Sequence, residues 1–395
     1  MAQRLAARVK RKRTMTTLLE ILLVCLIGSS IVFYLTCAVF THQFFAPVVN
    51  RAINAEEAKP PVSILVPVCG LDAGAWANWS SFCQQTYPHY EVLFGVTDPQ
   101  DPAIPVLQKV VATYADRARL FYGLKPRGIN YKDSNLSYLL EEARHELIIF
   151  ADSDIRVHAD YIHTVTSPLA DEKVGLVTCA FIGYYPQSLG AAIASFGRCF
   201  DFIPSLLIAR TLDRGLRCAV GATIATRKAT LASFGGLHFN RIGSDYNLGK
   251  RAAQAGYRIE LSRYVLESDT GHESLAEVFQ RELRWARTIR FNRGAQYYSM
   301  VLCYGTVYCV PLLLLTGCAN WAIVFSLATL TVRYLQVLLA MLRINCPRLL
   351  LWLWALPLRD ALNLFVWFMG AFGQGVYWRG RQLRVEGDGL ITQWE

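Results

Sequence analysis

The sequence predicts an α/β domain with a mainly parallel sheet, flanked on both sides by membrane segments. Short apolar runs alternate with helical patterns through a polar middle region, as they do in α/β proteins. The 395 residues are 53% hydrophobic and 18% charged, with a mean hydropathy of +0.26. This composition is too apolar for an ordinary soluble protein and too charged for a pure transporter.

The first predicted membrane segment covers residues 21–40. It contains no charged side chain and is long enough to cross the hydrocarbon core of a bilayer. A basic segment, residues 1–20, precedes it. Since no small-x-small cleavage site follows closely, a signal peptide is the weaker interpretation. A transmembrane helix and a re-entrant helix both fit this stretch.

The middle region predicts alternating strands and helices. Apolar, β-branched or aromatic runs predict strands at 62–68, 90–96, 119–123, 147–151 and 174–179, and helical patterns lie at 104–114 and 135–143. Parallel sheets of this kind bind ligands at the carboxyl ends of their strands. Asp98 follows the second strand by two residues and Asp152 follows the fourth directly, so we expect both in one crevice.

The run Asp152-Ser153-Asp154 predicts a metal site. Two carboxylates at a strand end can hold a hard divalent cation, Mg²⁺ or Mn²⁺. Asp-x-Asp alone is a weak motif and is often a solvated turn, but the apolar strand before it favours the metal interpretation. Asp98 taken alone is better explained as a helix cap before Pro99, and only the other sites together favour a functional role.

Residues 276–294 predict an interfacial helix that carries Arg281-x-x-Arg284-Trp285. On a helix these three side chains share one face, so two guanidinium groups can hold phosphate while the indole packs over the pocket. Arginines 287, 290 and 293 follow at intervals of three and are expected to face lipid headgroups. An ordinary amphipathic interfacial helix is the alternative, and it is compatible with the first reading.

The second apolar region predicts about three transmembrane helices within residues 297–372. Two are expected at about 297–316 and 319–342, separated near Gly317, and a third at 349–372. The last contains Arg359 and Asp360, which we expect to be paired and to face the helix bundle, because charges in hydrocarbon are costly. Residues 373–395 form a basic tail.

Charge and cysteine content indicate which kinds of partner, site and compartment fit this chain. Much of the net charge of +10 lies beside apolar spans, which favours anionic lipid headgroups over nucleic acid. None of the 11 cysteines forms a Cys-x-x-Cys pair. Neither a zinc site nor a disulfide framework is therefore indicated, and a reducing compartment is the simplest interpretation.

These motifs together resemble the family 2-type glycosyltransferases with a GT-A fold. Within them the sequence is similar to the ceramide glucosyltransferases and to bacterial transferases that glycosylate hopanoids. The similarity is carried by Val62-Ser63-Ile64-Leu65, Tyr87-Pro88-x-Tyr90-Glu91-Val92-Leu93, Asp98-x-x-Asp101-Pro102-Ala103, Gly128-x-Asn130-x-Lys132-x-x-Asn135-Leu136, Asp152-Ser153-Asp154-Ile155-Arg156-Val157, Gly175-Leu176-Val177, Arg281-x-x-Arg284-Trp285 and Trp378-Arg379-Gly380-Arg381. The resemblance implies a GT-A catalytic domain, a Rossmann-like mixed sheet, over residues 60–275.

The resemblance also implies a role for each site residue. The donor, a UDP-sugar, would be bound by Asp98, Asn130, Lys132, Asp152, Arg281, Arg284 and Trp285, with the metal on Asp152 and Asp154. Asp245 would be the general base. Family members usually have Glu-Asp at this point, whereas this chain has Ser244-Asp245, so the acidic neighbour of the base is missing.

The acceptor side is less defined. His272 and Glu273 lie in a predicted turn, where related transferases place acceptor or donor contacts, although a surface histidine in a turn often has no such role. Some ceramide glucosyltransferases carry a Ser-His-Pro triplet in an earlier helix. The matching stretch here is Phe202-Ile203-Pro204, which weakens a strict assignment to ceramide.

The expected activity is the inverting transfer of one hexose, glucose or N-acetylglucosamine, to a hydroxyl of a membrane lipid of the ceramide or hopanoid type. We expect a multi-pass membrane protein whose catalytic domain faces the cytosol, where nucleotide sugars are found; the sequence predicts no oligomeric state. A cytosolic basic N-terminus conflicts with this after one crossing, unless Met15 is the true start or the first segment is re-entrant. A processive polysaccharide synthase and a non-catalytic scaffold of the same fold are the alternatives.

Overall fold

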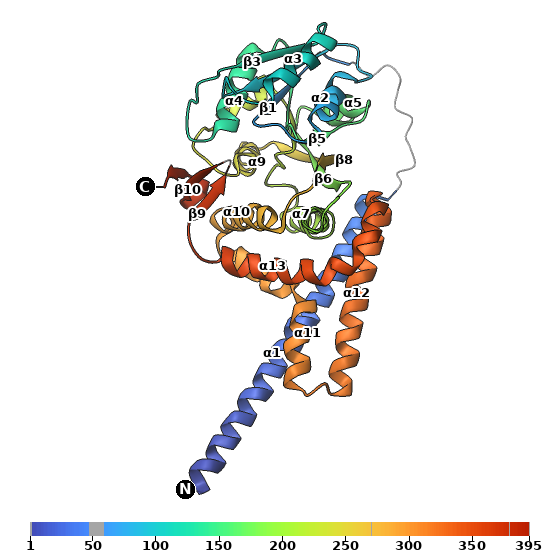
Figure 1. The fold of residues 1–395 in the computed structure, drawn as a ribbon, viewed down its shortest axis with the longest axis vertical. Coiled ribbons are helices and arrows are strands. Elements are labelled where there is room, and N and C mark those ends of the chain that lie inside the picture. Colours follow the sequence, from blue (N-terminus) through green and yellow to red (C-terminus); the bar gives the residue numbers. More distant parts are fainter. Residues whose placement is uncertain (1, 47–58, 270, 379, 395) are drawn as a thin grey trace.

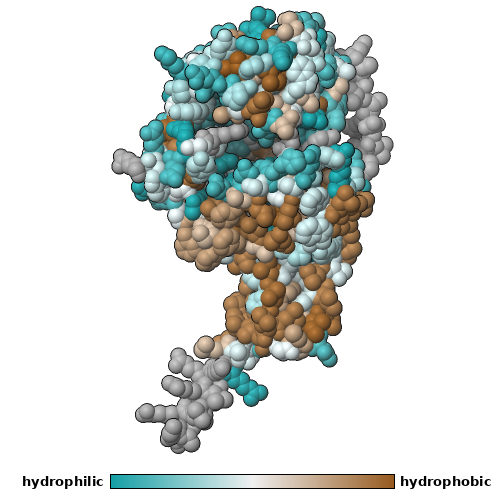
Figure 2. All heavy atoms as spheres, viewed as in Figure 1, coloured by the Kyte–Doolittle hydropathy of each residue, from teal (hydrophilic) through white to brown (hydrophobic). Residues whose placement is uncertain are grey.

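The computed structural model describes residues 2–46, 59–269, 271–378 and 380–394. A polar α/β domain stands on a layer of helices, from which a narrower helical stalk extends (Figure 1). The stalk and the layer have a hydrophobic surface, whereas most of the surface of the domain in the same view is hydrophilic (Figure 2).

The domain is built on one eight-stranded mixed sheet. Its strands are β1 (Val62–Val68), β2 (Tyr90–Val96), β3 (Ala118–Tyr122), β4 (Leu147–Ala151), β5 (Ile155–Arg156), β6 (Val174–Tyr184), β7 (Thr223–Arg227) and β8 (Arg258–Asp269), in the spatial order β3-β2-β1-β4-β7-β6-β8-β5. The first four strands in this order are parallel, and β7 is antiparallel to both of its neighbours. All five predicted strands are present, and the antiparallel β7 makes the sheet mixed.

Helices cover both faces of the sheet. Because alternate residues of a strand point to opposite faces, Leu65 and Ile64 of β1 belong to different hydrophobic clusters. The Ile64 side is covered by α2 (Ala75–Cys83), α3 (Ile104–Thr113) and α5 (Tyr161–Thr166). The Leu65 side is covered by α4 (Tyr131–Glu142), α6 (Leu189–Phe196), the π-helix η2 (Gly197–Phe202), α7 (Ile203–Leu212) and α9 (Ser244–Gln254).

The stalk consists of α1 (Ala2–Phe44), α11 (Gly305–Leu315) and α12 (Asn320–Ile344) (Figure 1). Leu23 and Ile27 of α1 are buried against Tyr308 and Leu312 of α11. The N-terminal end of α1 and the turn between α11 and α12 both lie at the end of the stalk far from the domain. Since α1 runs unbroken along the stalk, the re-entrant interpretation of the first segment does not fit.

Four helices are long and apolar enough to cross a membrane, or five if one bent pair counts as a span, among the residues that the structure describes. One of them, Leu189–Leu212, is mostly buried. It lies in the domain, between the sheet and the helical layer, and is therefore a core element. The bent pair joins α10 (Leu275–Arg293) and the 3-10 helix η3 (Gly294–Cys303) to α11.

The last predicted span is one of the four candidates, but it lies at an angle to the stalk. It comprises the 3-10 helix η4 (Pro347–Ala355) and α13 (Leu356–Gly370), which lies crosswise to α11 and α12 (Figure 1). A crossing would place the C-terminal tail on the far side of the membrane, yet the Ile391 amide donates to the Asn240 carbonyl of the domain at 2.9 Å. The helix and the tail therefore lie on the domain side of the stalk, with Phe365 and Phe368 exposed and Arg359 buried.

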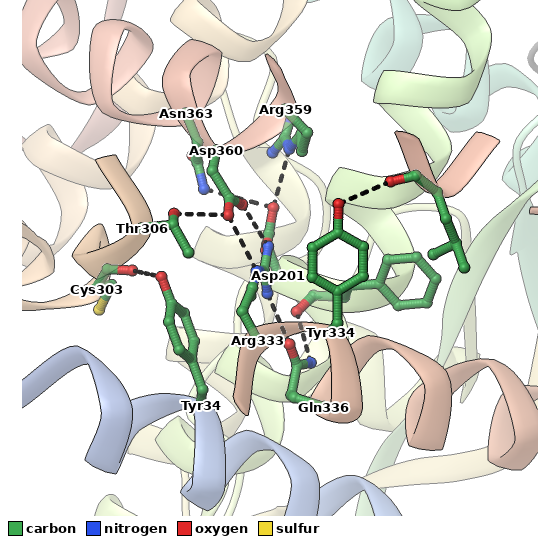
Figure 3. A network of polar contacts seen from close by, with 12 residues as sticks. Tyr34, Asp201, Cys303, Thr306, Arg333, Tyr334, Gln336, Arg359, Asp360 and Asn363 are labelled. Atoms are coloured by element: carbon green, nitrogen blue, oxygen red, sulfur yellow. Dashed lines mark hydrogen bonds and ion pairs between the residues drawn. The ribbon is translucent and has the colours of Figure 1, made fainter. Parts of the chain in front are cut away.

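An ion-pair network joins this layer to the domain (Figure 3). Arg359 contacts Glu282 of α10 at 2.6 Å and Asp201 of η2 at 2.9 Å, and Arg333 of α12 contacts Asp201 at 2.8 Å and Asp360 at 2.7 Å. As predicted, Arg359 and Asp360 are paired. Because the network holds η2, α10, α12 and α13 together, it fixes the domain on its membrane helices.

The expected contact of the later α10 arginines with headgroups is wrong. Arg290 donates to the carbonyls of Ala371 and Gly373 just after α13. Arg287 donates to the carbonyls of Phe372 and Gly375. Cations at a helix C-terminus satisfy its free carbonyls and its dipole, so these two arginines attach α13 to α10.

The basic tail is a folded part of the domain. It forms a three-stranded antiparallel sheet from β9 (Gly375–Trp378), β10 (Arg381–Val385) and β11 (Ile391–Gln393). Asp388 in this segment pairs with Arg241 and Lys250, each at 2.7 Å. A headgroup-binding extension is therefore not what these residues form.

Candidate active site

The site lies where β4 ends and where α4 and α9 begin. Asp152 follows β4, and its amide donates to the Ala222 carbonyl just before β7 at 3.1 Å. The Lys132 ammonium, in the first turn of α4, contacts the Asp152 carboxylate and donates to the Gly221 carbonyl at 3.3 Å. This cation lies at the carboxyl end of the central strands; its predicted contact with a diphosphate stays a prediction.

Asp245 faces the same crevice from the first turn of α9. Its Oδ2 accepts a hydrogen bond from the Gly221 amide at 2.8 Å, so Gly221 lies between Asp245 and Lys132. A side chain at Gly221 would meet this carboxylate, since an added Cβ would lie 2.8 Å from Oδ2. The close approach requires glycine and sets the direction of the Asp245 side chain.

The charges in the crevice interact. Burial alone would lower the pKa of Lys132, but the carboxylates of Asp152, Asp245 and Asp133 outweigh burial and raise it. Burial raises the pKa of Asp152; Lys132 opposes this effect and the charge of Asp154 adds to it. Lys132 therefore remains a cation, and the crevice holds a cation among several acids.

Two residues that the sequence analysis missed support Asp154. The Ser268 hydroxyl donates to Asp154 Oδ2 at 3.4 Å, and Arg198 donates to Ser268 Oγ at 3.1 Å. Arg198 is buried on η2, and π-helical segments are frequent at functional sites. An arginine in the apolar stretch that follows Leu189 was the one available signal.

The Arg281 side chain lies between Glu273 and Trp285. Its guanidinium pairs with the Glu273 carboxylate and packs over the Trp285 ring at 5.4 Å. Its Nε and Nη2 atoms are buried and have no hydrogen-bond partner among the described residues. Buried donors of this kind suit an anionic group of a substrate.

Arg284 faces the tail sheet, packed over the Trp378 ring of β9 at 5.7 Å. Arg381 of β10 packs over Tyr131 at 4.1 Å and donates to the Ile129 carbonyl at 2.9 Å, next to the start of α4. The tail therefore forms a wall beside Lys132 and Arg284. The sequence analysis described residues 373–395 only as a basic tail and predicted no strands there, so it missed this wall.

Asn130 has a structural role instead of the predicted contact with the donor. Its Oδ1 accepts from the Asp133 amide at 3.2 Å, as the N-cap of α4. Its Nδ2 donates to Asp133 Oδ2 at 3.0 Å and to the Arg241 carbonyl at 2.8 Å. Both amide hydrogens are used inside the protein, so none is left to donate to a diphosphate.

The remaining predicted residues lie at the surface. Asp98 is exposed, and its Oδ1 accepts from the Gln100 amide at 2.9 Å, which closes a local turn after β2. His272 is exposed in the loop before α10. Glu273 is tied to Arg281, and its backbone carbonyl accepts from Ser188 Oγ at 2.7 Å, so its visible role is to fix that loop.

The acids suit a cation that arrives with a substrate. No group of three or more His, Cys, Asp or Glu side chains could hold a metal ion within the described parts of the chain. Asp152 and Asp154, however, are two like charges at one strand end. Mg²⁺ usually takes one or two carboxylates and completes its shell with phosphates and water, so this pair fits Mg²⁺ or Mn²⁺ bound to a diphosphate.

Comparison with protein-family profiles identifies the family of this chain. The profile of Glycosyl transferase family 21 matches residues 21–391. The chain belongs to glycosyl transferase family 21. Among similar proteins, ceramide glucosyltransferase 3 of Caenorhabditis elegans is 26% identical over 254 residues, which cover 60% of this chain and 52% of that protein. An N-acetylglucosaminyltransferase of Rhizobium meliloti is 22% identical over 260 residues, with 61% and 59% covered. This family 21 chain spans about half the length of the curated relatives it matches.

A solved structure establishes the fold of this family 21 protein. The mannosyltransferase PcManGT from Pyrobaculum calidifontis, in complex with GDP-Man and Mn²⁺, aligns with a TM-score of 0.52 at 15% identity. The alignment covers 89% of this chain and 97% of that chain. The mixed sheet and the membrane-associated helices therefore form a GT-A glycosyltransferase fold, as the sequence predicted.

Proposed function

We propose that the protein transfers one hexose from a UDP-sugar to the hydroxyl of a ceramide-type membrane lipid, with inversion. The observation that carries the proposal is that Lys132 contacts Asp152, and that Asp245, bonded to the Gly221 amide, lies near both in a domain joined to apolar helices. A lipid hydroxyl at the membrane surface lies near the domain without leaving the bilayer. Similarity to ceramide glucosyltransferases supports this acceptor class; a hopanoid offers the same hydroxyl chemistry.

In the proposed mechanism Asp245 accepts the proton of the acceptor hydroxyl as the oxygen attacks the anomeric carbon. Its hydrogen bond to the Gly221 amide holds the carboxylate in place. Lys132 and Arg284 offset charge on the departing diphosphate, and Asp98 contacts the uridine. Asp152 and Asp154 would hold a divalent cation, which would supply further neutralisation of the leaving group when bound.

The proposed orientation places the domain in the cytosol. Among the residues that the structure describes, α1, α11 and α12 run along the stalk while α13 lies on the surface. An odd number of crossings puts the start of α1 on the side opposite to the domain and the tail. In this orientation the basic N-terminus lies on the non-cytosolic side. We expect an impermeant maleimide to label a cysteine introduced into the tail only after the membrane is permeabilised; labelling in intact cells would contradict the orientation.

We expect detergent-purified protein to add one hexose to ceramide when it is given UDP-glucose. Mass spectrometry of the lipid product checks this, with parallel reactions that contain UDP-N-acetylglucosamine and a hopanoid polyol. One added hexose on a lipid supports the proposal and identifies the substrates. A long saccharide chain would instead support a processive synthase, and transfer only to soluble acceptors would overturn the lipid assignment.

We also expect activity to require Mg²⁺ or Mn²⁺ and to disappear in excess EDTA. Asp154→Ala should weaken both the rate and the response to added metal, because one of two carboxylate ligands is lost. Titration of the activity with each metal measures both effects. Full activity of the wild type in EDTA would show that these aspartates hold no metal.

A further inference from the structure

Asp133 is a buried carboxyl group for which the proposed mechanism has no use. It lies in the first turn of α4 and is 3% exposed. Its Oδ1 accepts from Ser244 Oγ at 3.0 Å, and its Oδ2 accepts from Asn130 Nδ2 at 3.0 Å. Burying a carboxyl group is costly unless it is hydrogen-bonded, and each oxygen here has one defined donor.

The Ser244 contact anchors the start of α9. The N-cap of this helix, Gly243, is in the left-handed region with φ 62° and ψ 46° and provides no side-chain cap. Ser244 is the first residue of the helix and Asp245 is the second. Helix α9 therefore has no side-chain cap of its own at this end. The Asp133 carboxylate of α4 holds this end instead, through Ser244, the residue next to Asp245.

A second hydrogen bond also joins the start of α4 to the segment before α9. Asn130 Nδ2, besides holding Asp133, donates to the Arg241 carbonyl at 2.8 Å, just before α9. Asp133 and Ser244 are 111 residues apart in the chain. Asn130 and Asp133 therefore form a small buried cluster that joins the beginnings of α4 and α9, the helices that carry Lys132 and Asp245.

We propose that Asp133 is a positioning residue for Asp245, holding the first turn of α9 through Ser244 so that the Asp245 carboxylate stays on the Gly221 amide beside Lys132. The inference rests on the proposed function, in which Asp245 is the base. It also assigns an acidic neighbour to that base. This neighbour comes from another helix, whereas position 244 itself is a serine.

The charge state of Asp133 offers an independent test. Burial raises its pKa to about 7, and the charge of Asp245 adds to this, while Lys132, the Ser244 hydroxyl and Arg251 of α9 oppose it. An acid whose pKa is raised by folding stabilises the fold below its unfolded pKa, and this contribution is lost as the pH rises towards 7. Replacing Asp133 by a neutral residue should therefore increase the stability of the fold more at pH 8 than at pH 5.

The experiment compares Asp133→Ala, Ser244→Ala and the double alanine variant with the wild type, because alanine removes the oxygen that accepts from Ser244 Oγ. Asp133→Asn, which keeps an acceptor at this position, is used for the pH measurement. If about 1 Å of displacement at a reacting group costs up to ~10²-fold, kcat should fall about 10-fold or more in each single variant, while UDP binding changes less than about 2-fold. The double variant should lose no more than the worse single variant, because both changes break one contact. Glu141→Gln, at an exposed acid on the same helix, is the matched control and should keep its kcat.

Melting temperatures complete the test. The melting temperature of Asp133→Asn minus that of the wild type should be larger at pH 8 than at pH 5. If Asp133→Ala does not fold, Ser244→Ala, which loses one hydrogen bond, decides the question. An unchanged kcat in Ser244→Ala, or a loss of UDP binding as large as the loss of kcat, contradicts the positioning role. A wild type without transfer contradicts the proposed function instead.

Discussion

Asp245→Asn is expected to lower kcat by about 10²–10⁴-fold, the range that a positioned general base contributes, while donor binding changes little. The asparagine can still accept from the Gly221 amide, so the local geometry is retained and only proton removal is lost. Steady-state transfer to the lipid, together with UDP binding by calorimetry, separates the two effects.

Glu172→Gln is the control for this variant, because Glu172 is an exposed acid before β6. It should keep full activity and stability. Transfer by Asp245→Asn near the wild-type rate would remove Asp245 from the role of base. A parallel loss of UDP binding would instead assign it to the donor.

Arg359→Met should destabilise the protein by about 3–5 kcal/mol, the usual cost of leaving a buried charge without its partner. Glu282 loses its ion-pair partner, while Asp201 keeps Arg333. Glu282 is 7% exposed, so water cannot readily replace the arginine. Thermal unfolding in detergent measures the effect.

Two further variants make this prediction specific. Arg258→Met removes a pair with Asp171 in which both side chains are about half exposed, and exposed pairs contribute about 0–1 kcal/mol. Glu282→Gln added to Arg359→Met should recover part of the loss, since the uncompensated charge is removed. If Arg359→Met and Arg258→Met melt alike, the network does not hold the domain on its membrane helices.

Much of the fold could be read from local patterns. Strand β4 is a continuous apolar run, and β1 and β2 are apolar except for Ser63 and Glu91, because both faces of these strands are buried. Such runs are typical of central strands. The antiparallel β7 was missed. Its sequence, Thr223–Arg227, is short and half polar, and its place beside β4 depends on pairing with a strand distant in the chain.

The candidate site, like the fold, has residues that the sequence indicated and residues that only the packing brings in. Asp152 and Asp154 were found because they directly follow a strand, and a strand end fixes where the next side chains lie. Asn130 was assigned to the donor from resemblance, yet its amide is used in capping α4 and holding Arg241. Arg198 stood out only as an arginine in an apolar stretch, and the sequence linked neither Arg198 nor Ser268 to Asp154, since that relation arises only when η2 and β8 pack together.

The sequence by itself determined the α/β class, the apolar segments and the acids at the strand ends, because periodicity, length and local order carry that information. The tertiary structure alone decided that α13 lies crosswise to the stalk, that the tail packs beside Lys132 and Arg284, and that Asp133 reaches Ser244. Length and hydropathy cannot distinguish a crossing helix from a surface one. That choice depended on the tail pairing with the domain, and the other two depended on contacts between segments far apart in the chain.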